Sequence, residues 1–273
     1  MIVIGIYDDH NSSAALSIDG EIVCAVQEER FTKRKNEKGF PKNSVSYILK
    51  KYNLNNVNID IIAMSTVQRT DLNNIKYPID AVFEISDYID MMEYYWKPKL
   101  SGNPYPKDYA KDVFKKKFNS EECFYNVPDS FFELESDKLQ KSITDIVIDD
   151  VATFIGVDKE KVKFYDHHTC HVMYGYYANP NRKNKTIGIT IDAYGDGRNQ
   201  TIWKIENNKF ELIADSAECD IARLYRMVTL YLRMKPLEHE FKVMGMAPYA
   251  KDKYANEVLK VFDGLLKFDG LRI

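Results

Sequence analysis

The chain of 273 residues is long enough for one large domain or two modest ones with a real hydrophobic core. Apolar residues make up 45% and charged residues 29%, and the net charge of -3 gives no basic footprint for DNA or an anionic membrane. No apolar run reaches transmembrane length, there is no secretory signal pattern, and the four cysteines lie far apart without a CxxC pair. These features predict a cytoplasmic protein with reduced thiols.

The first 65 residues predict a three-stranded meander followed by a helix and a fourth strand. We expect strands at 2–7, 14–18, 21–27 and 59–65, and a helix at about 41–52. Asp19-Gly20 is a strong signal for a two-residue hairpin turn. The first strand ends in an acidic turn at residues 8–13, and residues 28–35 form a charged loop.

Residues 66–135 are less regular, because several prolines divide them into short pieces. We predict a helix at 107–117 and interpret the segment as a mostly helical insertion. Its many aromatic side chains either form a lid or substrate wall, or simply pack a subdomain core. Residues 136–155 have apolar residues at helical spacing, and a fifth strand at 162–165 leads into a cluster of histidines.

Three of the five histidines fall between positions 167 and 171. On a helix, His167 and His171 would lie one above the other and could bind one divalent metal. Residues 186–192 are typical of a buried strand, and Asp192 at its carboxyl end is a candidate third ligand. Alternatively, His167 caps the helix and His171 is packed or solvated. Cys170 should point about 100° away, so we do not count it as a ligand.

The pattern of the first strands recurs after the histidines. Strands are expected at 186–192, 200–206, 210–215 and 268–273, and a helix at 221–233. Asn207-Asn208 takes the place of Asp19-Gly20, and Asp192 that of Asp8. The repeat predicts an α/β fold of two duplicated lobes, as in actin, hexokinase and Hsp70, that is, an actin-like ASKHA (RNase H-like) architecture. We expect a first lobe at 1–180, with the insertion at 66–135, and an incomplete second lobe at 181–273.

Five segments carry a further pattern, in order along the chain. They are Asp9-His10-Asn11-Ser12-Ser13-Ala14-Ala15-Leu16; Glu28-Glu29-Arg30-Phe31-Thr32 with Gly39-Phe40-Pro41; His167-His168-Thr169-Cys170-His171; Thr190-Ile191-Asp192-Ala193-Tyr194-Gly195-Asp196-Gly197; and Glu240-Phe241-Lys242-Val243-Met244-Gly245-Met246-Ala247-Pro248-Tyr249. Together they resemble the NodU/CmcH-type O-carbamoyltransferases, which include tobramycin carbamoyltransferase. The amino-terminal domain of that family is related to the Kae1/TsaD proteins.

The resemblance implies a two-domain chemistry. A YrdC-like domain, absent from this chain, makes carbamoyl-adenylate from carbamoyl phosphate and ATP. The Kae1-like domain then transfers the carbamoyl group to an acceptor hydroxyl, such as one on a sugar or a natural product, and AMP is released. The metal ligands of the family fall on His167, His171 and Asp192, with one further aspartate expected beyond residue 273. The implied cofactor is Fe²⁺, with Mn²⁺ or Zn²⁺ as alternatives.

The resemblance also implies roles for residues outside the metal site. His10 is the candidate base or carbamoyl contact, with a structural role as the alternative. The expected substrate or nucleotide contacts are Asn11, Ser13, Arg30, Lys33, Gly195, Asp196, Lys242 and Gly245. For the basic run at 30–35 the alternative is a solvated edge, and for Gly245 it is loop packing. Ala193 and Asn11 depart from the glycine and aspartate usual in the family.

Two other functions compete with O-carbamoyl transfer. A TsaD-like tRNA threonylcarbamoyl transferase shares the fold and the histidine pair, but mild acidity gives no support for tRNA, and the 28–31 and 240–249 motifs favour the O-carbamoyl branch. A non-catalytic lobe that needs a partner chain is the second alternative, since this chain alone is expected to be incomplete and inactive. The partners expected are the small substrates, a YrdC-like domain in the same chain or another, and a second copy in a homodimer.

Overall fold

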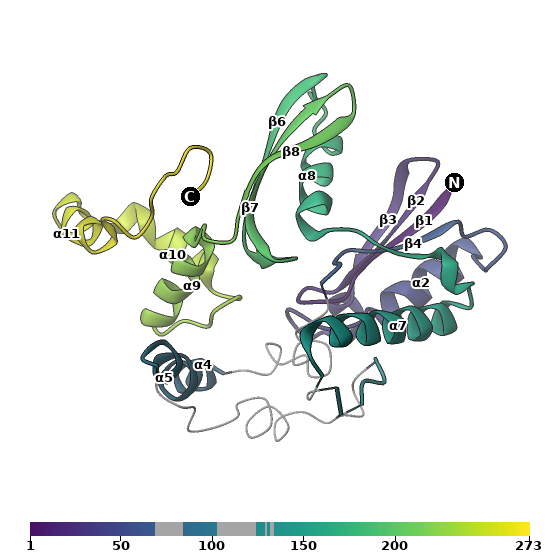
Figure 1. Cartoon of the computed structure of the whole chain (residues 1–273), viewed down its shortest axis with the longest axis horizontal. Helices are drawn as coiled ribbons and strands as arrows, with labels where there is room; N and C mark the ends of the chain where they lie inside the picture. The colour runs from purple at the N-terminus through teal and green to yellow at the C-terminus, as the bar shows by residue number, and fades with distance from the viewer. Residues whose placement is uncertain (69–83, 103–123, 129, 132–133) are drawn as a thin grey trace. The chain divides into compact units, whose positions relative to one another are not determined.

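In the computed structural model the chain folds into two compact units (Figure 1). The first comprises Met1–Phe83 and Asp90–Tyr165, and the second Glu84–Ile89 and Asp166–Ile273. The residues that the structure describes are 1–68, 84–102, 124–128, 130–131 and 134–273. The helix predicted at 107–117 lies outside them.

The first unit is built on a five-stranded mixed sheet of order β3-β2-β1-β4-β5. Its strands are β1 (Ile2–Tyr7), β2 (Ser13–Ile18), β3 (Glu21–Gln27), β4 (Ile61–Met64) and β5 (Val162–Phe164). The first three pair antiparallel, whereas β4 pairs parallel with both β1 and β5. The meander predicted from the Asp19-Gly20 turn is confirmed, and both residues of that turn have positive φ angles.

Two helices complete the core of this unit. The helices are α2 (Lys42–Tyr52) and α7 (Ser136–Ile155), both close to their predicted bounds and both running alongside the sheet in Figure 1. Alternate residues of β1, Ile4 and Ile6, are buried in one cluster with Ile48 of α2 and Ile143 of α7. The pattern follows from the strand period of two and the helical period of 3.6, which place one face of each element against the other.

The predicted charged loop at 28–35 is wrong at its start. Residues Glu29–Thr32 form a short helix, α1, and the Glu28 side chain is 4% exposed. The Glu28 carboxylate accepts hydrogen bonds from the backbone N–H groups of Asn43 and Ser44 at 2.9 and 2.8 Å and from both of their side chains. It therefore caps the first turn of α2 from fifteen residues upstream, which the local charge pattern could not indicate.

Within the 66–135 segment, the described residues 85–100 are helical, whereas residues 124–128 form neither helix nor strand. The helical part contains α4 (Ile85–Met91), the π-helix η2 (Met92–Trp96) and α5 (Lys97–Leu100). Tyr88 of α4 is buried, and the guanidinium of Arg226 lies 5.9 Å from its ring centroid, within the second unit. Before β5, the short 3₁₀-helix η6 spans Lys159–Lys161.

The second unit contains a three-stranded antiparallel sheet of order β6-β7-β8, against which α8 (His167–Tyr177) packs. The strands are β6 (Lys185–Gly195), β7 (Arg198–Glu206) and β8 (Lys209–Ser216). Val172 and Tyr176 of α8 form a small core with Trp203 and Ile205 of β7. The predicted second meander is thus present, and Asn207-Asn208 forms its turn with positive φ angles.

Two predictions for this unit are wrong. The first strand is not buried on both faces, because Ile187, Ile189 and Ile191 are 58, 61 and 45% exposed while Gly188 and Thr190 face α8. An unbroken apolar run fits a one-sided strand as well as a two-sided one. The predicted strand at 268–273 is a turn, closed by paired backbone hydrogen bonds between Asp269 and Arg272, with Gly270 at φ 59°.

Four helical segments follow the sheet. They are α9 (Ile221–Tyr231), α10 (Glu240–Met246), the 3₁₀-helix η7 (Ala247–Tyr249) and α11 (Asp252–Phe262). Among the described residues, no helix combines the length and the apolar character needed to cross a bilayer.

Candidate metal site

The helix that carries the histidines begins at a doubly capped amino terminus. The Asp166 carboxylate accepts from the backbone N–H and the hydroxyl of Thr169 at 2.8 and 2.9 Å. Asp196, in the turn between β6 and β7, accepts from the backbone N–H of His167 at 2.7 Å. Both carboxylates satisfy N–H groups that have no partner inside a helix, so they fix where α8 starts and how it meets β6.

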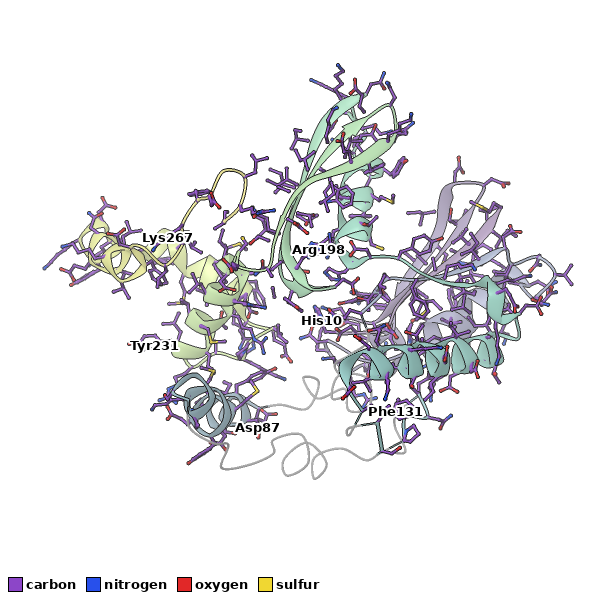
Figure 2. The ribbon with its side chains drawn as sticks, viewed as in Figure 1. His10, Asp87, Phe131, Arg198, Tyr231 and Lys267 are labelled. Atoms are coloured by element: carbon purple, nitrogen blue, oxygen red, sulfur yellow. The ribbon has the colours of Figure 1, made fainter. Side chains whose placement is uncertain are left out.

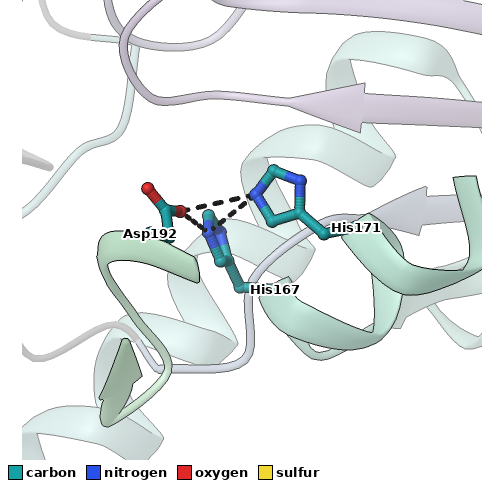
Figure 3. Close-up of side chains that lie close together, drawn as sticks. All are labelled: His167, His171 and Asp192. Carbon is teal, nitrogen blue, oxygen red and sulfur yellow. Dashed lines mark hydrogen bonds and ion pairs between the residues drawn. The ribbon is translucent and has the colours of Figure 1, made fainter. Parts of the chain in front are cut away.

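The structure brings His167, His171 and Asp192 together, as the sequence predicts (Figure 3). The Nε2 atoms of the two histidines are 3.0 Å apart, and Asp192 Oδ2 lies 2.5 Å from His167 Nε2 and 3.4 Å from His171 Nε2. Four-residue spacing on α8 brings the two rings together edge to face, with their centroids 4.5 Å apart, and β6 supplies the carboxylate directly after its last regularly paired residue, Ile191.

The three donors fit a divalent transition metal. Two imidazole nitrogens and a carboxylate oxygen are ligands typical of zinc, iron or manganese, and metal–ligand distances near 2 Å place tetrahedral donors about 3.3 Å apart. The side chain of His167 is 12% exposed, whereas those of Asp192 and His171 are 35 and 54% exposed. The cluster is thus anchored on one side and open on the other, which leaves room for further ligands.

Gly195 is required by the position of the His167 ring. A Cβ atom at residue 195 would lie 2.2 Å from His167 Cδ2, well inside the closest approach of two carbon atoms. Gly195 and Asp196 were predicted to contact substrate or nucleotide. In the structure both act on His167, one by leaving space for its ring and the other by bonding its backbone.

Within the cluster, His167 and Asp192 each stabilise the charged form of the other. Burial alone would raise the pKa of Asp192, but hydrogen bonds from His167, His171 and the Ala193 backbone hold it well below its usual range. For His167, burial alone would lower the pKa, but the hydrogen bond to Asp192 and the charges of Asp192, Asp196 and Asp166 raise it. Without metal, the pair therefore favours an imidazolium bonded to a carboxylate.

We expect metal affinity and metal-free stability to respond to pH in opposite directions. Because the pKa of His167 is raised, its interactions stabilise the metal-free fold. This contribution is complete below pH 6.5 and is lost as the pH rises through the folded-state pKa. The lowered pKa of Asp192 contributes above 3.8 and is lost at lower pH. Metal must displace the proton from His167, so affinity should increase as pH rises above 6.5. Metal titrations and thermal unfolding at pH 5.5 and 8.5 check this; equal affinities would contradict it.

The residues between the two histidines are not part of the donor set. Burial raises the pKa of the Cys170 thiol to about 11, so it stays protonated, in agreement with its exclusion as a ligand. Burial lowers the pKa of His168, whose ring nitrogens face Thr190 Oγ1 at 2.7 Å and the Arg198 carbonyl at 3.1 Å.

The first acidic turn, in the other unit, forms a second polar cluster, and His10 is labelled in Figure 2. The Tyr7 hydroxyl lies 3.2 Å from His10 Nδ1, and the His10 backbone donates to Asp9 at 2.8 Å. Lys38, whose side chain is 3% exposed, pairs with the same Asp9 oxygen at 3.2 Å. Burial raises the pKa of Asp9, but Lys38 and His10 outweigh it and lower the pKa.

Lys38 was not predicted, and the predicted basic residues lie elsewhere. The Arg30 side chain is 67% exposed, and Lys33 Nζ donates to the Arg30 carbonyl at 2.8 Å. In the sequence, Lys38 is marked only by the glycine that follows it. In the structure, Gly39 has a φ of 95°, which favours glycine. Asn11 also has a positive φ, and Ser13 begins β2.

The two predicted residues of the 240–249 motif lie on a helix rather than a turn. Lys242 and Gly245 belong to α10, which packs on α9. A Cβ atom at Gly245 would meet nothing within 4 Å, so close packing does not explain that glycine.

The molecule is thus a mixed α/β protein with a His/His/Asp cluster formed by a helix and a neighbouring strand. The chain belongs to the carbamoyltransferase N-terminus family, whose model matches residues 2–273. The predicted resemblance is therefore confirmed.

Three relatives show how much of a longer protein this chain matches. It is 26% identical to the uncharacterized protein sll1178 of Synechocystis over 96% of this chain and 36% of the relative. It is 25% identical to the uncharacterized protein MJ1051 of Methanocaldococcus jannaschii over 91% and 33%. Nodulation protein NolNO of Sinorhizobium fredii is 22% identical over 97% and 31%. The chain thus spans about a third of the length of these relatives.

Proposed function

We propose that this chain is the acceptor-side domain of an O-carbamoyltransferase. The carbamoyl group comes from carbamoyl-adenylate, which a YrdC-like domain forms from carbamoyl phosphate and ATP. The acceptor is a hydroxyl group on a sugar or natural product. The observation that carries the proposal is the His167/His171/Asp192 donor set in a chain that matches the family model from residue 2 to residue 273. The finer fold belongs to the proposal too: two actin-like lobes at 1–180 and 181–273, supported by the paired meanders.

The residues divide the chemistry as follows. The acceptor oxygen attacks the carbamoyl carbon, the bond from that carbon to the phosphate oxygen breaks, and AMP leaves with the bonding electrons. A divalent ion, iron in our proposal, supplies charge stabilisation for the departing phosphate when bound. His167, His171 and Asp192 hold and orient that ion. His10 of the first unit is our candidate for the base that takes the hydroxyl proton, since the tautomer whose Nδ1–H donates to the Tyr7 hydroxyl leaves Nε2 able to accept.

The experiment is a transfer assay on the purified protein together with a YrdC-like domain. With carbamoyl phosphate, ATP and a panel of hydroxyl acceptors, we expect carbamoylated product and AMP. His171→Ala should reduce transfer by at least about 100-fold, since it removes a metal ligand, and carbamoyl-adenylate formation should continue. Cys170→Ala is the matched control on the same helix and should retain transfer.

Two outcomes would refute the proposal. Full transfer by His171→Ala would show that a metal held by this residue is not needed for the reaction. Formation of threonylcarbamoyl-tRNA in a parallel assay supplied with threonine, bicarbonate, ATP and tRNA, with no O-carbamoylated product from the panel, would favour the TsaD-like alternative instead.

A further inference from the structure

A chain of four hydrogen bonds runs through the interior of the second unit beside the candidate metal site. It joins Trp203 Nε1 to Thr201 Oγ1 at 2.8 Å, Thr201 Oγ1 to Thr190 Oγ1 at 2.5 Å, and Thr190 Oγ1 to His168 Nδ1 at 2.7 Å. His168 Nε2 completes it at the Arg198 carbonyl, 3.1 Å away, and Arg198 is labelled on β7 in Figure 2. His168 and Thr201 are fully buried, and Thr190 is 7% exposed.

Each of these four hydrogen bonds has a defined donor and a defined acceptor. A carbonyl can only accept, so His168 Nε2 carries a proton and donates it to Arg198. In the neutral ring Nδ1 then accepts from the Thr190 hydroxyl, and Thr190 in turn accepts from Thr201. The indole N–H can only donate, which closes the chain at Thr201. All four bonds point the same way, an arrangement in which each bond polarises the next.

The series of hydrogen bonds connects α8 and β6, the two elements that carry the metal ligands. His168 follows His167 on α8, and Thr190 precedes Asp192 by two residues on β6; both β6 residues contact α8, Thr190 through His168 and Asp192 through His167. The bond between His168 and Thr190 is thus a buried link from α8 to β6 next to the partly exposed contact between His167 and Asp192.

Apolar packing alone would not fix this geometry so closely. A rotation or slip of α8 on the sheet would separate His168 from Thr190 and leave buried polar groups unpaired, which is unfavourable for each group. Apolar contacts such as those of Val172 would tolerate the same movement better, since they have no preferred direction.

We propose that His168 is a positioning residue which, through its bond to Thr190, sets the separation of His167 and Asp192 and thereby the affinity of the site for a divalent metal. The proposal rests on the metal role proposed above. His168 need touch neither metal nor substrate for this role, because it acts through α8 and β6.

Thr190→Val and Thr190→Ser form the matched pair that tests this role. Valine has the shape of threonine without its hydroxyl, and serine keeps the hydroxyl. Co²⁺ is the probe, since its d–d absorption reports both affinity and ligand geometry. Loss of the hydroxyl should weaken Co²⁺ binding about 10- to 100-fold and change the spectrum, and Thr190→Ser should remain near wild type. If Thr190→Val does not fold, Thr201→Val removes the next link and should cause a smaller but measurable loss.

A second measurement tests the hydrogen bond between His168 and Thr190 in the metal-free protein. Two-bond ¹H–¹⁵N spectra of the histidine rings should show His168 in its Nε2–H tautomer, and an Nδ1 signal that is the same in Thr190→Val as in the wild type would show that the ring does not bond Thr190 and would overturn the proposal. Wild-type Co²⁺ affinity in Thr190→Val would also overturn it while leaving the metal site standing. If the wild type itself binds no Co²⁺, the proposed metal role fails and the positioning role falls with it.

Discussion

His167→Ala is expected to abolish divalent-metal binding. The mutation removes the donor that touches both other ligands, because His167 Nε2 lies 3.0 Å from His171 and 2.5 Å from Asp192. His171 and Asp192 would then remain as two partly exposed groups, 3.4 Å apart, with no third donor from the cluster. We expect affinity to fall by more than about 100-fold, beyond the loss typical of outer-shell changes.

The measurement is thermal unfolding with and without metal. At a free metal concentration 100 times the wild-type Kd, binding should stabilise the wild type by about 2.7 kcal/mol and the variant by almost nothing. Cys170→Ala is the control on the same helix, and it should keep the full metal-dependent shift, since its protonated thiol is not a donor. An equal metal-dependent shift in His167→Ala would show that these residues do not form a metal site.

The metal cluster could be predicted from sequence because its geometry is local on each element. Helical spacing brings His167 and His171 side by side, and Asp192 follows the last regularly paired residue of β6. What the spacing could not supply was the support around them. The need for Gly195 depends on a ring 28 positions earlier in the chain, and the capping role of Asp196 depends on where α8 begins.

Residues whose roles come from distant partners escaped prediction in the same way. Glu28 looks like part of a solvated charge run, yet it is buried because the N–H groups of a helix start fifteen residues later need an acceptor. Lys38 is one base among several near it, and only the fold brings it to Asp9. The fold was more predictable, since alternating and helical patterns gave the two meanders, and α2 and α7 nearly at their observed bounds. Burial failed at Ile189, because apolar character alone does not say which face of a strand is covered.

Gly195→Ala should disrupt the metal site, although it removes no ligand. The added Cβ would lie 2.2 Å from Cδ2, 2.4 Å from Cγ and 2.7 Å from Nε2 of the His167 ring. Gly195 does not have a positive φ, so alanine introduces no backbone strain and the clash with the ring is the whole effect. The ring must turn away from Asp192, or the end of β6 must move and carry Asp192 with it.

Gly175→Ala is the matched control, since Gly175 lies on α8 and a Cβ atom there would meet nothing within 4 Å. It should bind Co²⁺ like the wild type, with a gain in helix stability of about 0.5–1 kcal/mol. For Gly195→Ala we expect Co²⁺ affinity at least about 10-fold below wild type and an unfolding free energy lower by about 1–3 kcal/mol, as for other overpacked sites. Wild-type affinity in Gly195→Ala would mean that His167 binds metal with its ring in another place. Only the observed position of the His167 ring makes residue 195 intolerant of a single methyl group.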